Sequence, residues 1–232
     1  MRDLLVVVPT RERPHNVADL LLAWKDTGAR ADLCFGVDDD DTTADAVKTI
    51  HGERLTTGAQ LSVITGPRLG MAATLNTLAA WHSDRYRYIG FMGDDHRPRT
   101  PEWDRIIVDG LDDRAHGIGY GDDLVHGETL PTAAIVSSTI VRALGWIAPP
   151  RLQHLYLDNF WATLGRRLGS LRYFPDVIIE HVHPIVGKAE WDAGYQRVNS
   201  PAVSEADRAE FERWCSEDMD RDVEKVRAST LV

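Results

Sequence analysis

The first hundred residues alternate between short apolar runs and stretches with helical periodicity. Continuous β-favouring runs occupy residues 4–8, 32–37, 61–64 and 86–92, as expected for strands buried on both faces. Helical patterns begin near Asn16, cover residues 45–50 and 71–81, and resume after Pro101. Asn16 with Asp19 resembles a capping box for the first helix. This alternation predicts an α/β fold with a mostly parallel central sheet flanked by helices.

The second half of the chain is less regular. Residues 118–120, 133–138 and 177–180 favour strands, and residues 155–168 favour a helix. A charged helix is expected over residues 204–227, with Ser204 and Asp207 as a cap pair. Its apolar residues are sparse, so we expect it to pack at the surface.

The composition of the chain disfavours several classes of function and location. The 232 residues are 43% hydrophobic and carry a net charge of −10, which disfavours generic nucleic-acid binding because that affinity rests on Lys and Arg. No apolar run is long enough for a transmembrane segment, and the apolar run near the N-terminus is too short for a signal peptide. Cys34 and Cys215 fit no metal-site spacing, so the sequence predicts a reducing, cytoplasmic location.

Polar residues follow three of the predicted strands, at positions 9–11, 38–41 and 93–96. Ligands of open parallel sheets bind beyond the carboxyl ends of the strands, so these segments are expected at one rim. Two acidic clusters at one rim repel each other unless a cation lies between them, and a divalent metal bridging a diphosphate satisfies this need. The alternatives are a solvated turn at residues 94–95 and a helix cap at residues 38–41.

Further candidate residues lie downstream. His181 and His183 share one face if they belong to a strand, and either one is a candidate metal ligand beside Asp95 or a polar surface residue. Asp158 is either a helix N-cap or a general base whose pKa is raised by neighbouring aromatic residues. The turn at residues 67–70 enters a helix whose backbone N–H groups suit a phosphate or sugar. The chain has neither a P-loop nor a G-x-S-x-G elbow.

Taken together, residues 4–185 resemble the GT-A glycosyltransferases, in particular the family 2-like group. VVVPTRERP is similar to the family's opening strand and nucleotide-binding loop. The resemblance implies base and ribose contacts from residues in that loop, namely Pro9, Thr10, Arg11 and Arg13. Asp38 matches the position that reads the nucleobase. Arg68, Gly70 and Asn76 resemble the segment that lies along the donor sugar and phosphates.

The metal motif departs from the family pattern at one position. Gly93-Asp94-Asp95 stands in the place of the D-x-D motif, with glycine where the first acid usually stands. The resemblance then implies that Asp95 binds Mn²⁺ or Mg²⁺ together with His181 or His183, and that Asp94 contacts the ribose or sugar.

The acceptor side shows a second similarity. Leu157-Asp158-Asn159-Phe160 resembles the family's Glu-Asp motif, with leucine where the glutamate usually stands. By that resemblance, Asp158 is the base of an inverting mechanism.

The resemblance implies a GT-A catalytic domain over residues 1–200, with a nucleotide-sugar-binding half (1–100) and an acceptor half (101–200), followed by a helical extension (201–232). The implied activity is hexosyltransferase-like, with a nucleotide diphosphate sugar, expected to be UDP-linked, as the donor. The acceptor hydroxyl belongs to a saccharide, a lipid-linked sugar, a small molecule or a modified nucleic acid.

Two alternative functions remain. A sugar-phosphate nucleotidyltransferase is disfavoured because residues 10–13 lack the glycine-rich loop of that class. A non-catalytic nucleotide-sugar-binding module is consistent with the missing first acid.

Overall fold

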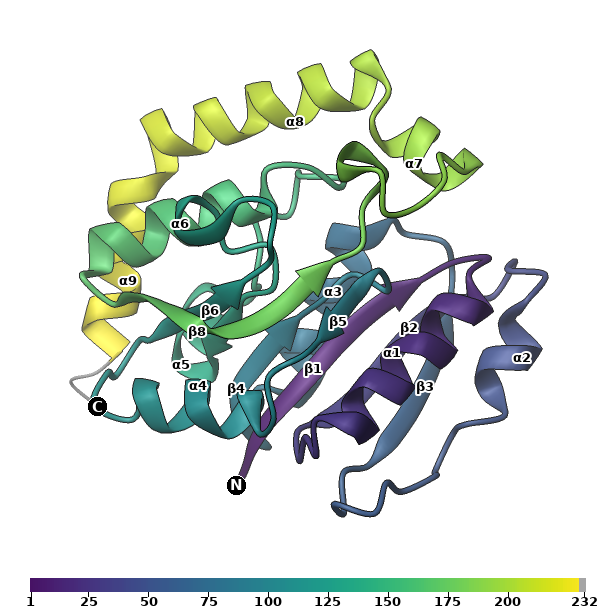
Figure 1. Ribbon diagram of the computed structural model, residues 1–232. Coiled ribbons are helices and arrows are strands. Elements are labelled where there is room, and N and C mark those ends of the chain that lie inside the picture. The colour runs from purple at the N-terminus through teal and green to yellow at the C-terminus, as the bar shows by residue number, and fades with distance from the viewer. Residues whose placement is uncertain (230–232) are drawn as a thin grey trace.

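The computed structural model describes residues 1–229 as a curled eight-stranded sheet with helices on both faces (Figure 1). The strands are β1 (Arg2–Thr10), β2 (Asp32–Asp38), β3 (Leu61–Gly66), β4 (Tyr86–Phe91), β5 (His96–Pro98), β6 (Ile118–Asp122), β7 (Ile135–Ser137) and β8 (Leu171–His181). Their order is β3-β2-β1-β4-β7-β6-β8-β5. The first four strands are mutually parallel, β6 is parallel to β8, and β7 and β5 run antiparallel to their neighbours. The predicted mostly parallel α/β fold is confirmed.

Helices connect and cover the strands. The α-helices are α1 (Pro14–Asp26), α2 (Ala44–Lys48), α3 (Met71–His82), α4 (Trp103–Leu111), α5 (Ser138–Leu144), α6 (Leu157–Leu168), α7 (Ala193–Val198), α8 (Pro201–Arg213) and α9 (Met219–Ala228). Short 3₁₀ turns η1 (Gly127–Thr129) and η2 (Pro184–Val186) and a π-helical turn η3 (Trp214–Asp218) complete the chain. Within residues 1–229, no helix combines the length and hydropathy that crossing a bilayer requires.

The central strand β1 divides the hydrophobic core into two layers. Leu4, Val6 and Val8 pack in the layer that contains residues of α1 and α4. Leu5 and Val7 face the opposite layer, which contains residues of α3, α5 and α6. Because successive side chains of a strand point to opposite faces, the continuous apolar run of β1 is what burial on both faces requires.

Neither predicted capping pair forms. Helix α1 begins at Pro14, two residues before Asn16, and α8 begins at Pro201, three residues before Ser204. Proline is favoured in the first helical turn because its φ is already helical and its missing N–H has no partner there in any case. Asn16 is therefore free to donate to Asp94 in the loop after β4, and Asp207 lies in the middle of α8 rather than at its start.

The second half differs most from the prediction. Only Ile135–Ser137 of the run 133–138 is a strand, and the unpredicted helix α5 follows it at once. Strand β8 is longer than the expected 177–180, and it pairs with a three-residue strand from the first half, β5, that was not expected. β5 contains a proline and pairs only with β8, so its formation depends on a distant partner rather than on local pattern.

The C-terminal helices lie on the outside of the molecule, with α9 beside α6 (Figure 1), yet three apolar residues of η3 and α9 are buried: Trp214, Val223 and Val226. Trp214 is 1% exposed, and its ring packs edge-on against Phe160 at 4.7 Å between centroids. Val223 and Val226 belong to the same core layer. The expected surface position is therefore confirmed, and a few large side chains anchor this surface segment to the core.

Trp214→Ala is expected to lower the free energy of unfolding by about 3–5 kcal/mol, the usual cost of removing a buried tryptophan. Its indole N–H also donates to Asp222 at 3.1 Å, so the change leaves that buried carboxylate without this partner. Urea unfolding followed by far-UV circular dichroism measures the change. An unchanged midpoint would show that residues 201–229 are energetically separate from the sheet.

Candidate active site

A cavity of about 410 Å³ opens beyond the carboxyl ends of β1, β2 and β4. Its lining includes residues from both halves of the chain, from α6 and from the segment 193–203. All but one of the site residues predicted from the sequence lie in this lining: Pro9, Thr10, Arg11, Arg13, Asp38, Arg68, Gly70, Asp94, Asp95, Asp158, His181 and His183. The fold thus brings these side chains, which are up to 174 residues apart in the chain, to one cleft.

Asn76 is the exception. Its side-chain oxygen accepts hydrogen bonds from the backbone N–H groups of Ile147 and Ala148, each at 3.0 Å. Its amide nitrogen donates to the Ala148 carbonyl at 2.9 Å. These bonds tie α3 to the loop after α5, outside the cleft lining, so the structure gives Asn76 a scaffolding role and no support for the predicted donor contact.

The acidic run at residues 38–41 divides into two roles. Asp38 lines the cleft, where its carboxylate accepts a hydrogen bond from Arg11 at 3.0 Å. Asp41 is buried and accepts from the backbone N–H groups of Glu12 and Thr43, at 2.8 and 2.7 Å. The N-cap of α2 is Thr43, without a side-chain cap bond, so Asp41 holds the loop before the helix rather than capping it. Asp38 remains the residue of this run that lines the cleft.

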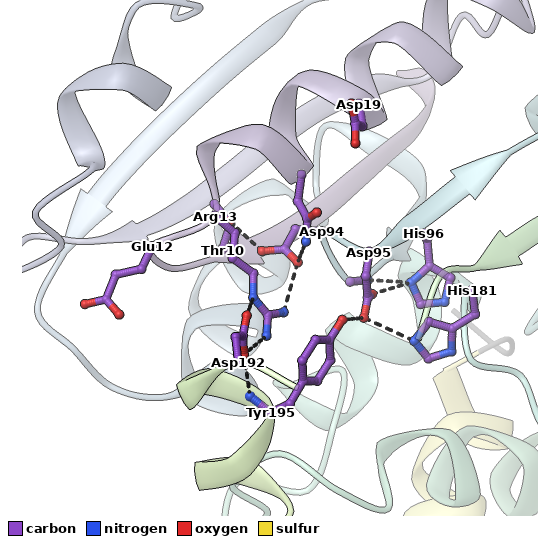
Figure 2. Close-up of polar contacts among 12 residues, drawn as sticks. Thr10, Glu12, Arg13, Asp19, Asp94, Asp95, His96, His181, Asp192 and Tyr195 are labelled. Carbon is purple, nitrogen blue, oxygen red and sulfur yellow. Dashed lines mark hydrogen bonds and ion pairs between the residues drawn. The ribbon is translucent and has the colours of Figure 1, made fainter. Parts of the chain in front are cut away.

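Asp94 is a buried carboxylate at the end of β4 (Figure 2). It accepts hydrogen bonds from the Thr10 hydroxyl at 2.6 Å and the Asn16 amide at 3.1 Å, and it forms an ion pair with Arg13 at 3.3 Å. Burial, reinforced by the neighbouring charge of Asp95, raises the Asp94 pKa. These contacts connect the first strand's loop to the acidic loop after β4.

Asp95 is surrounded by two histidines and a tyrosine (Figure 2). Its carboxylate oxygens lie 3.3 Å from His96 Nδ1 and 3.3 Å from His181 Nε2, and Tyr195 donates its hydroxyl hydrogen to Asp95 Oδ2 at 2.7 Å. Burial alone would raise the Asp95 pKa, but the two histidines bring it well below the ordinary value. For His181, burial opposes protonation, yet the hydrogen bond and charge of Asp95 raise its pKa.

Asp95, His96 and His181 fit a metal ion. Each offers one ligand atom, and the three atoms lie within 4.8 Å of one another. His96 Nε2 and His181 Nδ1 are buried and make no hydrogen bond to any residue in the described part of the chain. One carboxylate with two imidazoles suits Mn²⁺ or another transition metal better than Mg²⁺, which prefers oxygen ligands.

His96 was missed by sequence reasoning because its place depends on strand pairing. In the antiparallel register of β5 and β8, His96 lies directly opposite His181, and their rings stack with centroids 4.3 Å apart. His183 also lines the cleft, 5.0 Å from the His181 ring, but its Nδ1 accepts from the Ile185 N–H. Burial and the nearby His181 lower the His183 pKa to about 4.

A steric clash explains why residue 93, in the acidic motif, is glycine. A Cβ atom built on Gly93 would lie 2.4 Å from Asp95 Oδ1, far inside contact distance. The backbone N–H of Gly93 also donates to His96 Nδ1 at 3.1 Å. Any larger residue at position 93 would displace Asp95, so the departure from the family motif is linked to the way Asp95 and His96 are held.

Asp158 lies in the first turn of α6 and lines the cleft. The N-cap residue is Tyr156, with φ of 65°, so the N-cap interpretation of Asp158 is wrong. One carboxylate oxygen accepts from the Asn159 N–H at 2.9 Å. Burial raises the Asp158 pKa, as a base that accepts a proton near neutral pH requires.

Helix α7 and the residues before it were not predicted, yet they cover the acidic centre. Arg13 forms an ion pair with Asp94 on one side and Asp192 on the other, and its guanidinium lies 3.9 Å from the centroid of the Tyr195 ring. Burial and the charge of Asp95 raise the Tyr195 pKa, so its hydroxyl remains a donor. Helix α7 is only six residues long, too short for a clear helical pattern of apolar residues, so the sequence did not predict it.

Comparison with solved structures relates the fold to proteins of known chemistry. A mannosyltransferase, PcManGT from Pyrobaculum calidifontis, solved with GDP-Man and Mn²⁺, aligns over 99% of this chain and 74% of its own, with a TM-score of 0.62 and 14% identity. S. aureus TarS residues 1–349, solved with UDP-GlcNAc, aligns over 92% and 73%, with a TM-score of 0.57 and 12% identity. Neither a protein-family profile nor a curated sequence matches the chain. The chain therefore has the GT-A fold of the nucleotide-diphospho-sugar transferases.

Proposed function

We propose that this protein is a metal-dependent, inverting glycosyltransferase that moves a hexose from a nucleotide diphosphate sugar to an acceptor hydroxyl. The observation that carries the proposal is the shared cleft: Asp38, the Asp95 cluster and Asp158 all line one cavity. PcManGT and TarS, which have the same fold, were solved with GDP-Man and UDP-GlcNAc respectively. Asp38 fits a nucleobase N–H, and the donor expected from the sequence is UDP-linked.

Different side chains of the cleft would bind the diphosphate, hold the metal and accept the proton in such a reaction. Arg11, Arg13 and Arg68 line the cleft and are suited to the negative charge of a diphosphate. Asp95, His96 and His181 would hold Mn²⁺, which when bound neutralises charge on the leaving diphosphate. The acceptor hydroxyl gives its proton to Asp158 while its oxygen attacks the anomeric carbon, on the face opposite the leaving group.

Nucleotide sugars with Mn²⁺ are expected to stabilise the protein against heat. A ligand that binds only the folded state at 100 times its dissociation constant adds about 2.7 kcal/mol. Thermal-shift measurements with UDP-glucose, UDP-GlcNAc and GDP-mannose, each with and without Mn²⁺, test this, and Mg²⁺ should act more weakly. Failure of every donor to shift the melting temperature would contradict the proposal. Product analysis adds a second test, since release of pyrophosphate instead of a nucleoside diphosphate would indicate nucleotidyl transfer.

A further inference from the structure

Helix α8 buries an acid where an amphipathic helix would bury an apolar residue. Asp207 is the fully buried residue of this 13-residue helix, with 1% of its surface exposed. Its carboxylate accepts three backbone N–H bonds, from Gln153 at 2.8 Å, His154 at 2.9 Å and Leu155 at 2.7 Å. A buried carboxylate is costly unless such bonds satisfy it, so Asp207 and the loop 153–155 form one unit.

This loop joins the two sides of the cleft. The Gln153 carbonyl accepts from the N–H of Ala72 at 3.2 Å, in the first turn of α3 and next to Gly70. In the other direction the chain turns into α6, where Asp158 stands four residues after His154. The loop therefore lies between the segment expected along the donor sugar and the proposed base.

Gln153 and His154 of this loop both line the cleft with polar side chains, and His154 is the less exposed of the two. Its side chain lines the cleft, and its ring makes no hydrogen bond to the residues the structure describes. Burial lowers its pKa to about 4, so the imidazole is neutral. A neutral imidazole has one donor and one acceptor nitrogen, which matches a hydroxyl group, itself both donor and acceptor.

We propose that His154 hydrogen-bonds a hydroxyl of the transferred sugar, and that Asp207 is the positioning residue that holds His154 in place. The inference rests on the proposed function. It connects the C-terminal helix to sugar recognition. The proposed nucleotide contacts come from Asp38, at the end of β2, and Arg11, directly after β1, so the expected contribution of His154 belongs to the sugar alone.

The test compares a nucleotide sugar with its own nucleoside diphosphate. Dissociation constants for GDP-mannose and GDP, and for UDP-GlcNAc and UDP, are measured by calorimetry with Mn²⁺. His154→Ala should weaken binding of the nucleotide sugar about 3–10-fold, as loss of one neutral hydrogen bond predicts, and leave the nucleoside diphosphate unchanged. His154→Gln, which keeps a donor and an acceptor, should restore most of the loss. Asp207→Asn should cause the same selective loss, because its amide N–H₂ opposes the loop N–H groups.

Asp222→Asn is the matched control for Asp207. Asp222 is equally buried at 1% exposure, but it bonds Trp214 rather than the loop, so both affinities should stay at the wild-type value. If Asp207→Asn does not fold, Asp207→Glu replaces it, since the longer side chain displaces the loop. Equal effects of the His154 changes on sugar and diphosphate, or no effect, would overturn the inference alone. A wild-type protein that binds none of the four ligands would overturn the proposed function as well.

Discussion

Asp158→Asn is expected to reduce the turnover number of sugar transfer by about 10²–10⁴-fold, the range attributed to a well-placed general base. The carboxylate lines the cleft, and its hydrogen bonds come from the backbone N–H groups of Asn159 and of Asp158 itself, so no other side chain competes with an acceptor for it. Asparagine has nearly the same shape but takes up no proton. Donor binding should stay within about twofold of wild type, because the donor-side residues are unchanged. Steady-state kinetics combined with calorimetry separates the two effects.

Asp104→Asn is the control for Asp158→Asn. Asp104 is likewise an acid in the first turn of a helix, but it is fully buried, lies outside the cleft lining and accepts the N–H groups of Arg30 and Ala31. Its replacement should lower stability but leave the activity of the folded protein unchanged. Transfer by Asp158→Asn at more than a tenth of the wild-type rate would contradict the assignment of Asp158 as the base.

The pH profile of the wild-type enzyme follows from the same carboxyl group. Burial raises the Asp158 pKa in the folded protein, so protonation begins at a higher pH than for an ordinary aspartate, whose pKa is about 3.9. A base acts only when deprotonated. The acidic limb of kcat/KM should therefore lie above pH 3.9, with activity falling as the pH falls through the raised pKa. Profiles at saturating Mn²⁺ measure it, because metal loss at low pH would otherwise contribute.

The donor half of the molecule was predictable because its signals are local. Each parallel strand of residues 1–100 contains an apolar run, and three of the four are followed by polar residues that the sheet brings to one rim. Asp38, Asp94 and Asp95 were found in this way. Strand β5 and helix α7 were harder to predict, because they are only three and six residues long and are held by contacts with distant segments.

Residues whose role depends on contacts with distant parts of the chain could not be predicted from the sequence, because no local pattern marks such contacts. His96 acquires its role from the pairing of β5 with β8, and Tyr195 acquires its role from a hydrogen bond to Asp95, 100 residues away. Asp207 looked like half of a helix cap, since acids are common there, and only the fold shows three loop N–H groups around its carboxylate. The sequence around a polar residue in a helix does not indicate which distant groups it will bind.

Asp95→Asn is expected to weaken Mn²⁺ binding by more than 100-fold and to remove metal-stimulated transfer. Changing a residue that merely supports a metal ligand already costs 10–100-fold in affinity, so loss of a ligand should cost more. Asp95 supplies the only carboxylate of the three-residue cluster. Its hydrogen bond and negative charge also orient His181 and raise the pKa of His181. Because metal neutralisation of the leaving diphosphate contributes several kcal/mol, transfer should fall about a thousandfold or more.

Glu180→Gln separates loss of the metal ligand from loss of a nearby negative charge. Glu180 immediately precedes His181, but its carboxylate pairs with Arg99 and Lys188 outside the cleft lining. Mn²⁺ titrations followed by electron paramagnetic resonance should give wild-type affinity for this control and no saturable site for Asp95→Asn. Wild-type affinity in Asp95→Asn would place the metal elsewhere. Equal losses of Mn²⁺ affinity in both variants would show that Asp95 acts only through its negative charge. Direct coordination predicts instead that the loss occurs in Asp95→Asn alone.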